Sequence, residues 1–333
     1  MCCIKITKKI DYVMANPPFN VDEVNFSRVN DDPRFNTYGV PRNGVKKTAK
    51  KESDKKETVP NANYLWIGYF ATAMNAHGKA ALVMANSASD AGKSEYKIRR
   101  KMIEEGIISQ MVTLPSNMFS SVALPATLWF FDKHKPQTDR KDEILFIDAR
   151  NVFTQVDRAH RKFSDEQIRN LGIITRLYNG DTGAFAALIA EYQAERDRAP
   201  EEAEDKETKT KAYWQSQIDW LIERFPDGTY RDVIGLCKAA KLGVSYELDE
   251  NGDLKLDKAG EPIPIIEEDS IADQDYSLNA GRYVGVVIED DGMTEAEFRE
   301  TMLGLNAEYE ALNGEAKKFE EQIADNIKAL FGE

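Results

Sequence analysis

Short apolar runs alternate with helix-like segments over residues 11–149, and this alternation limits the fold more than any other feature of the chain. The apolar runs lie near 12–15, 80–85, 127–131 and 144–149. Strands that alternate with helices are typical of α/β domains with a mostly parallel sheet. We therefore expect an α/β domain here, in which the run at 12–15 forms a buried strand.

A stiff polar turn, Asn16-Pro17-Pro18-Phe19, follows the first of these runs. Each proline fixes its own φ and restricts the residue before it. The Asn16 amide oxygen and the Pro17 carbonyl oxygen can each accept one N–H of a planar amine, which exposes the lone pair on the nitrogen. Phe19 can stack on a nucleobase that has been flipped out of a duplex. The alternative is a proline-rich turn without chemistry.

This turn resembles the catalytic motif of adenine-N6 DNA methyltransferases, which take their methyl group from S-adenosylmethionine. The flanking sequence is similar to the modification subunit of type I restriction–modification systems, closely over residues 10–180 and more loosely over 275–330. The segments that carry the similarity lie at 61–66, 78–86, 98–106, 112–119, 127–131, 144–149 and 275–284.

The resemblance implies methyl transfer to a flipped adenine in double-stranded DNA. Asn16 and Pro17 would grip the amine, Phe19 would stack on the base, and Phe119 matches a position that can close its other face. The implied fold is the second half of a doubly wound methyltransferase sheet, with 127–131 antiparallel. A mixed helical and hairpin region and a long C-terminal helix would follow. The implied partners are DNA, a specificity subunit, a second modification subunit and a restriction subunit.

The cofactor-binding part of the family pattern is missing from this sequence. In the family, a Gly-rich turn and an acidic residue precede the catalytic motif, near the ends of the first strands. Here fifteen residues without a glycine precede Asn16, and no Gly-x-Gly occurs in the chain. We therefore expect the C-terminal portion of such a subunit, with an incomplete S-adenosylmethionine site whose residues stay unassigned. A truncated sheet would also expose a strand edge.

A long segment rich in basic residues, roughly 21–60, follows the motif. A loop of this length is unusual in a compact domain unless it is functional or disordered. One interpretation is contact with DNA phosphates, and the other is a mobile lysine-rich loop. The net charge of −13 argues against the whole chain as a free-standing DNA binder. The phosphate-contact candidates are Arg42, Lys46, Lys47, Lys50 and Lys51.

Composition narrows the class of protein. No apolar run approaches the length that spans a bilayer, and the lysine-rich N-terminus is unlike a signal peptide. We expect a cytoplasmic protein without a membrane partner. The spacing of Cys2, Cys3 and Cys237 and the scattered histidines predict neither a metal site nor a disulfide framework.

The second half of the chain is read from capping and periodicity. Ser164 and Gln167 have the spacing of a capping box before a helix that ends near Tyr178. A helical apolar stripe at 213–225 indicates core packing, and alternating residues at 244–256 around Asn251-Gly252 predict a β-hairpin.

Thr294 and Glu297 cap a last helix with a heptad-like apolar seam, which favours a partner interface over packing on its own domain. We thus expect a partial catalytic domain at 1–180, a helical and β-hairpin region at 181–290, and an assembly helix at 291–333.

Three functions compete. The first is the DNA adenine methyltransferase subunit. The second is a truncated, non-catalytic remnant or split half that assembles with a specificity subunit. The third is a methyltransferase for a glutamine amide, whose related motif usually carries tyrosine at the position of Phe19.

Overall fold

The computed structural model describes residues 9–22, 24–43, 58–119, 124–203, 205, 208–286 and 294–331. The chain divides into two units, residues 1–286 and 287–333, and each is described by itself. No helix in these ranges combines the length and the hydrophobicity needed to cross a bilayer.

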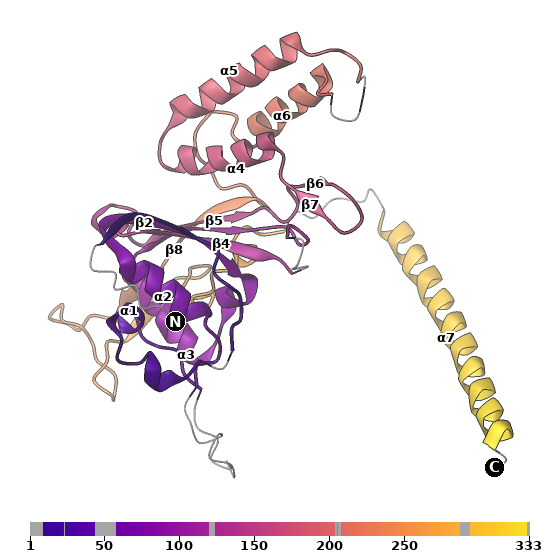
Figure 1. The fold of residues 1–333 in the computed structure, drawn as a ribbon, viewed down its shortest axis with the longest axis horizontal. Coiled ribbons are helices and arrows are strands. Elements are labelled where there is room, and N and C mark those ends of the chain that lie inside the picture. The colour runs from indigo at the N-terminus through magenta and orange to yellow at the C-terminus, as the bar shows by residue number, and fades with distance from the viewer. Residues whose placement is uncertain are drawn as a thin grey trace. The chain divides into compact units, whose positions relative to one another are not determined.

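A six-stranded mixed sheet organises the first unit (Figure 1). Its order is β1-β2-β4-β3-β5-β8, and β1 and β2 pair in parallel, as do β3 and β5. Strand β4 is antiparallel to both β2 and β3, which confirms the expected antiparallel run. Strands β1, β2, β3 and β5 therefore end at one edge of the sheet. The bounds are β1 Ile10–Ala15, β2 Met74–Ala85, β3 Ile108–Thr113, β4 Ala126–Asp132, β5 Glu143–Asp148 and β8 Cys237–Lys241.

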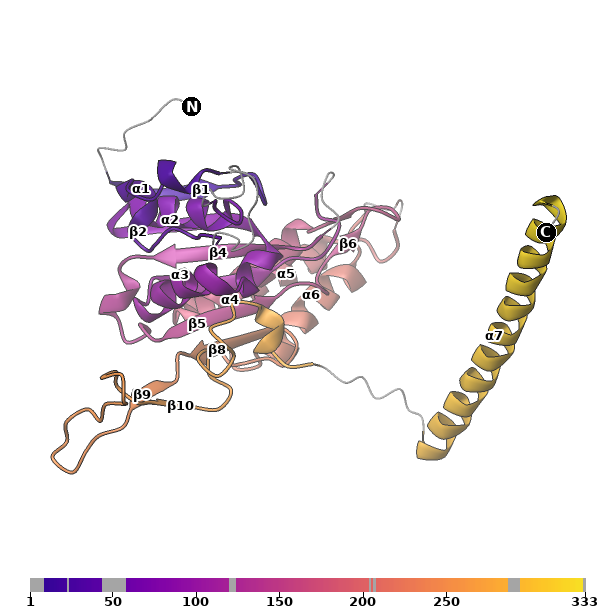
Figure 2. The ribbon, with the colours of Figure 1, turned by 90° about the horizontal axis from the view of Figure 1, so that it is seen from below.

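Helices cover both faces of the sheet (Figures 1 and 2). Helices α2 (Asn63–Ala73) and α3 (Lys93–Glu104) lie on one face. Three helices lie on the other: α4 Asp165–Tyr178, α5 Thr182–Arg198 and α6 Lys211–Arg224.

Strand β4 shows how both faces are packed. Trp129 and Phe131 join the core on the α2–α3 side, and Leu128 and Phe130 pack against the core on the other side. Successive side chains of a strand point to opposite faces, so a strand covered on both sides reads as a continuous apolar run. The α/β expectation is confirmed.

The helical predictions agree with the structure. The Ser164 hydroxyl accepts the Gln167 N–H at 3.2 Å, and the Gln167 side chain accepts the Ser164 N–H at 2.8 Å, which completes the capping box of α4. The stripe at 213–225 is core, since Ile218 and Leu221 of α6 are buried.

The first strand departs from its prediction. Tyr12 is 78% exposed and Met14 is 90% exposed, although we expected the run at 12–15 to be buried. In the described part of the chain, β1 pairs only with β2 and stands at the edge of the sheet. Burial of an apolar run depends on neighbours that the run itself does not reveal.

The predicted hairpin is only partly correct. Leu248 bridges Leu254 across the expected turn, but β9 (Val244–Tyr246) pairs antiparallel with β10 (Pro264–Ile266). A second turn, in which the Gly260 N–H donates to the Asp257 carbonyl at 3.1 Å, brings the chain back beside β9. Figure 2 shows β9 and β10 in this excursion.

Shorter elements complete the first unit. A 3-10 turn (Phe26–Arg28) and α1 (Pro33–Asn36) lie within the basic segment, where Val29 and Val59 pack with Leu65 in a small core. A separate short hairpin precedes α4, in which β6 (Thr154–Gln155) pairs antiparallel with β7 (Arg161–Lys162).

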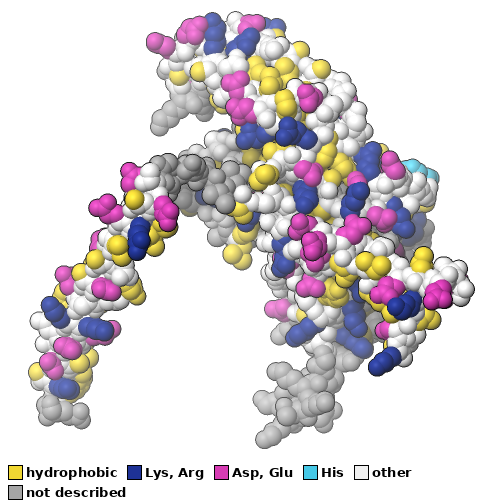
Figure 3. All heavy atoms as spheres, turned by 180° about the vertical axis from the view of Figure 1, so that it is seen from behind, with side chains coloured by type: hydrophobic (Ala, Val, Ile, Leu, Met, Phe, Trp, Pro, Cys, Tyr) yellow, Lys and Arg dark blue, Asp and Glu magenta, His cyan; other side chains and the backbone are white. Residues whose placement is uncertain are grey.

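The second unit is one helix, α7 (Glu295–Phe331). The Glu297 N–H donates to the Thr294 hydroxyl at 3.3 Å and the Thr294 N–H to the Glu297 carboxylate at 2.8 Å, as the capping prediction requires. Hydrophobic side chains run along α7 between charged ones (Figure 3). All its described residues are exposed, and the domain boundaries at 180 and 290 stay predictions.

Candidate functional site

The Asn-Pro-Pro-Phe turn lies at the edge where the parallel strands end. It begins directly after Ala15, the last residue of β1, which pairs with Leu82 of β2. Asn16 is exposed, Pro17 is buried, and Phe19 is half-buried against the core on the α4–α6 face. The amide of Asn16 is thus accessible to a ligand while the backbone behind it is held in place.

Asn63 anchors the residue that follows the motif. Its side-chain oxygen accepts the Asn20 N–H at 2.9 Å, and its side-chain nitrogen donates to the Asn20 side-chain oxygen at 2.8 Å. Asn63 is 2% exposed, and its own N–H donates to Asn61 at 2.9 Å. Asn20 has φ +52°, a left-handed conformation that asparagine tolerates better than most residues. This reciprocal pair, the Asn63–Asn20 clamp, ties the motif to the start of α2.

Sequence reasoning missed the clamp. An asparagine as the first residue of an apolar helix, with another asparagine two positions earlier, was the signal available in the sequence. The pairing with Asn20 could not be read from it, because the two residues are far apart along the chain.

Phe119 follows β3 at the same edge of the sheet and packs against the same core as Phe19. The segment before it is held by Arg161 of β7, whose backbone N–H donates to the Asn117 carbonyl at 3.0 Å. The Arg161 guanidinium also donates to the Ser116 hydroxyl at 3.1 Å. The structure therefore brings both predicted stacking residues to one edge and one hydrophobic core.

The carboxylate at the end of β5 is already paired. Asp148 is 7% exposed, and its two oxygens share the Arg150 Nε–H at 2.9 and 3.0 Å while one of them also accepts an Nη2–H at 2.6 Å. The hydrogen bond with Asp148 raises the pKa of Arg150 above its usual value. A carboxylate that is already hydrogen-bonded to an arginine guanidinium is a poor proton acceptor, so Asp148 does not suit the role of general base.

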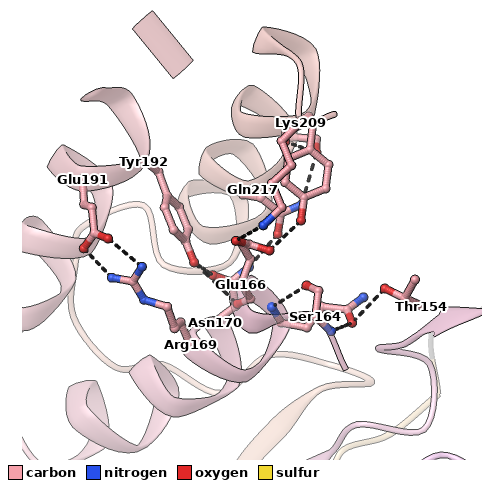
Figure 4. A network of polar contacts seen from close by, with 12 residues as sticks. Thr154, Ser164, Glu166, Arg169, Asn170, Glu191, Tyr192, Lys209 and Gln217 are labelled. Atoms are coloured by element: carbon pink, nitrogen blue, oxygen red, sulfur yellow. Dashed lines mark hydrogen bonds and ion pairs between the residues drawn. The ribbon is translucent and has the colours of Figure 1, made fainter. Parts of the chain in front are cut away.

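A polar network joins the three helices on the α4 face (Figure 4). Buried Glu166 accepts from the Lys209 ammonium at 2.6 Å and from the Tyr213 hydroxyl at 2.8 Å. Burial by itself raises the pKa of Glu166, but these hydrogen bonds outweigh it, and the pKa lies below its usual value. Thr154 donates to the capping residue Gln167 at 3.3 Å, so the network also reaches the β6–β7 hairpin. Its role is structural.

The remaining site predictions divide by location. Arg42 is exposed on a groove beside α3, while Lys46, Lys47, Lys50 and Lys51 lie outside the described residues. Within the described ranges, no group of three or more His, Cys, Asp or Glu side chains has the geometry of a metal site.

A cavity of about 380 Å³ lies against the exposed edge strand on the α4 face. Tyr12, Met14 and Phe130 line it together with the end of α4. None of the residues Asn16–Phe19 is among its lining, so this cavity is distinct from the motif.

Comparison with known proteins agrees with these observations. Residues 4–198 match the family model described as N-6 DNA Methylase. The chain is 29% identical to the type I restriction enzyme MjaIX methylase subunit of Methanocaldococcus jannaschii, over 96% of this chain and 42% of that protein. It is also 29% identical to the HindI methylase subunit of Haemophilus influenzae, over 98% of this chain and 52% of that protein.

A solved structure is also similar: the type I restriction-modification methyltransferase subunit of Streptococcus thermophilus has a TM-score of 0.49 and 18% identity, over 85% of this chain and 40% of that one. The chain spans about half the length of the curated relatives that it matches.

Proposed function

The chain belongs to the N-6 DNA methylase family, and we propose that it carries the amine-binding half of a type I restriction–modification methylase. The proposed reaction methylates the N6 amine of a flipped adenine in duplex DNA. The observation that carries the proposal is the exposed Asn16 amide on a turn whose next residue is clamped by Asn63. A protein that methylates DNA must reach the DNA inside the cell, and this agrees with the expected cytoplasmic location.

The motif residues act by positioning. The Asn16 side-chain oxygen and the Pro17 carbonyl oxygen would each accept one N–H of the adenine amine, so its lone pair points away from the ring plane. Phe19 would stack on the base, and Phe119 would close the opposite face. Holding the amine in line for attack supplies much of the rate without a general base.

S-adenosylmethionine supplies the methyl group in this family, but its site does not fit the residues described here. No Gly-x-Gly turn occurs in the chain, and no strand in the described ranges lies beside β1 on its outer side. We therefore assign no cofactor residue to this chain and confine the mechanism to the amine.

The test is methylation of duplex DNA by an assembled complex that contains the specificity subunit and the cofactor-binding strands. Asn16→Ala should abolish incorporation of a labelled methyl group without changing the size of the complex. Asn251→Ala, an exposed asparagine in the β9–β10 excursion, is the matched control and should keep full activity. Retained activity in Asn16→Ala would sink the proposal.

The second candidate function, a non-catalytic or split half, is favoured by the edge strand. Tyr12 and Met14 present apolar side chains at a strand edge that has no partner in the described part of the chain, which suits a polypeptide that adds a strand there. Copurification with a separately encoded half, without methyl transfer by the assembled complex, would support this candidate.

Helix α7 is the proposed contact with the specificity subunit. Its apolar seam has the four-and-three spacing of helical interfaces. The seam includes Phe298, Met302, Leu305, Tyr309, Leu312, Phe319 and Ile323, all of them at least half exposed.

A further inference from the structure

A groove of about 580 Å³ between residues 38–42 and helix α3 has a charge unlike the rest of the chain. Arg42, Lys93, Lys97 and Lys101 line it, and none of its lining residues is acidic. The whole chain has 57 acidic and 44 basic residues. Four cations together without an acid in the lining are therefore unexpected from composition, and they give the groove a locally positive potential.

The walls of the groove are fixed by hydrogen bonds. The Ser94 hydroxyl accepts the Arg42 N–H at 3.0 Å and donates to the Arg42 carbonyl at 3.1 Å. The Lys101 ammonium donates to the Thr37 carbonyl at 2.9 Å. Residues 37–42 are thus attached to α3 at two points, which fixes the backbone that carries Arg42 across the groove from the α3 lysines.

Three of the four cationic side chains form no ion pair with a carboxylate in the described part of the chain. Within the described ranges, no carboxylate forms an ion pair with Arg42, Lys93 or Lys97, and Lys101 has Glu105 at 3.9 Å. The first turn of α3 also holds the acidic residue Glu95, which offsets the helix dipole, so the positive potential of the groove comes from the four side chains that line it. Together these groups favour a ligand with several negative charges.

The groove is connected to the motif by both of its walls. Residues 38–42 belong to the loop that leaves the motif, and α3 follows β2 through the 3-10 turn Asn86–Asp90. Strand β2 pairs with β1, which carries the motif. We propose that this groove binds the phosphodiester backbone of nucleic acid, and the choice of duplex DNA rests on the proposed function.

The experiment measures binding of a fluorescein-labelled DNA duplex to the full chain by anisotropy over a series of KCl concentrations. The groove variant is Arg42→Gln/Lys93→Gln/Lys97→Gln, and it keeps Lys101 because that side chain holds the loop. The control removes the same charge at the other edge of the sheet, where β8 lies, and from the segments on either side of β8: Arg231→Gln/Lys238→Gln/Lys258→Gln.

Each contacted phosphate contributes a slope of about 0.9 to the dependence of log affinity on log salt, so the groove variant should lose roughly 2 to 3 from the slope of the wild type. The control should keep the wild-type slope. Equal slopes in all three proteins, or no DNA binding by the wild type, would overturn the assignment. Inorganic phosphate should displace DNA no better than chloride at equal ionic strength, and stronger displacement would mean a pocket for free phosphate instead. Because methylation is tested separately through Asn16, either proposal can fail while the other stands.

Discussion

Replacement of Asn63 by alanine tests whether the Asn63–Asn20 clamp holds the Asn-Pro-Pro-Phe turn in place. The change removes both hydrogen bonds of the clamp, at 2.9 and 2.8 Å, from a side chain that is 2% exposed. A typical hydrogen bond contributes about 1 kcal/mol net, and a buried group left without a partner costs about 1–3 kcal/mol. Because Asn20 is exposed and water can satisfy it, we expect Asn63→Ala to lower the free energy of unfolding by about 2 kcal/mol.

Two further variants separate the halves of the clamp. Asn63→Asp keeps an acceptor for the Asn20 N–H but loses the donor, so its cost should be intermediate at neutral pH. Asn20→Gly loses the side-chain half but relieves the left-handed backbone at φ +52°, and its net effect should lie within about 1 kcal/mol of zero.

The assay is urea unfolding followed by tryptophan fluorescence, with the denaturant slope checked for constancy. A midpoint for Asn63→Ala equal to that of the wild type would refute the reasoning. It would mean that the clamp adds nothing to stability and does not hold the turn.

The other predictions concern packing and titration. Gly78→Ala should cost about 1–3 kcal/mol, because a methyl group there would lie 2.8 Å from the Ile10 carbonyl oxygen, whereas Gly172→Ala in α4 meets nothing and should stabilise by about 0.5–1 kcal/mol. Both are measured by urea unfolding, and equal effects would contradict the packing argument. Burial raises the pKa of the Cys237 thiol to about 12, so iodoacetamide at pH 8 should modify it only after unfolding, as read by peptide mass spectrometry. Glu166→Gln should cost about 1–3 kcal/mol at neutral pH. Since the folded pKa of Glu166 is lowered, this difference should shrink as the pH falls below about 4.5, and a constant difference would refute the paired carboxylate.

The parts of the fold that depend on local pattern were predictable from sequence. The alternation of apolar runs with helix-like segments predicted the α/β class. The capping box at Ser164 predicted the start of α4, because a cap and its partner lie within one turn of helix. The antiparallel orientation of β4 came from the family resemblance and is confirmed.

Features that depend on distant partners were not predictable. The exposure of Met14 depends on what lies beside β1, and the partner of β9 depends on a second turn around Gly260. Lys93 and Lys97 read as ordinary surface residues of a helix until the fold places Arg42 across the groove. In each case the sequence supplied the residue type, and the tertiary structure supplied its neighbour.

The proposed reaction needs a site for the adenine amine and a site for the cofactor, and in this chain only the amine site has candidate residues. The proposed grip on the amine would use residues that are all described: the motif after β1, the clamp from α2, and Phe19, which packs on the core. Among the residues that the structure describes, strand β1 pairs on one side, with β2. A polypeptide that paired with the free side would cover Tyr12 and Met14 and fix the motif from both sides. Pairing at the outer edge of β1 and stiffening of the motif are thus expected to be one physical event, since the same strand carries both the edge and the motif.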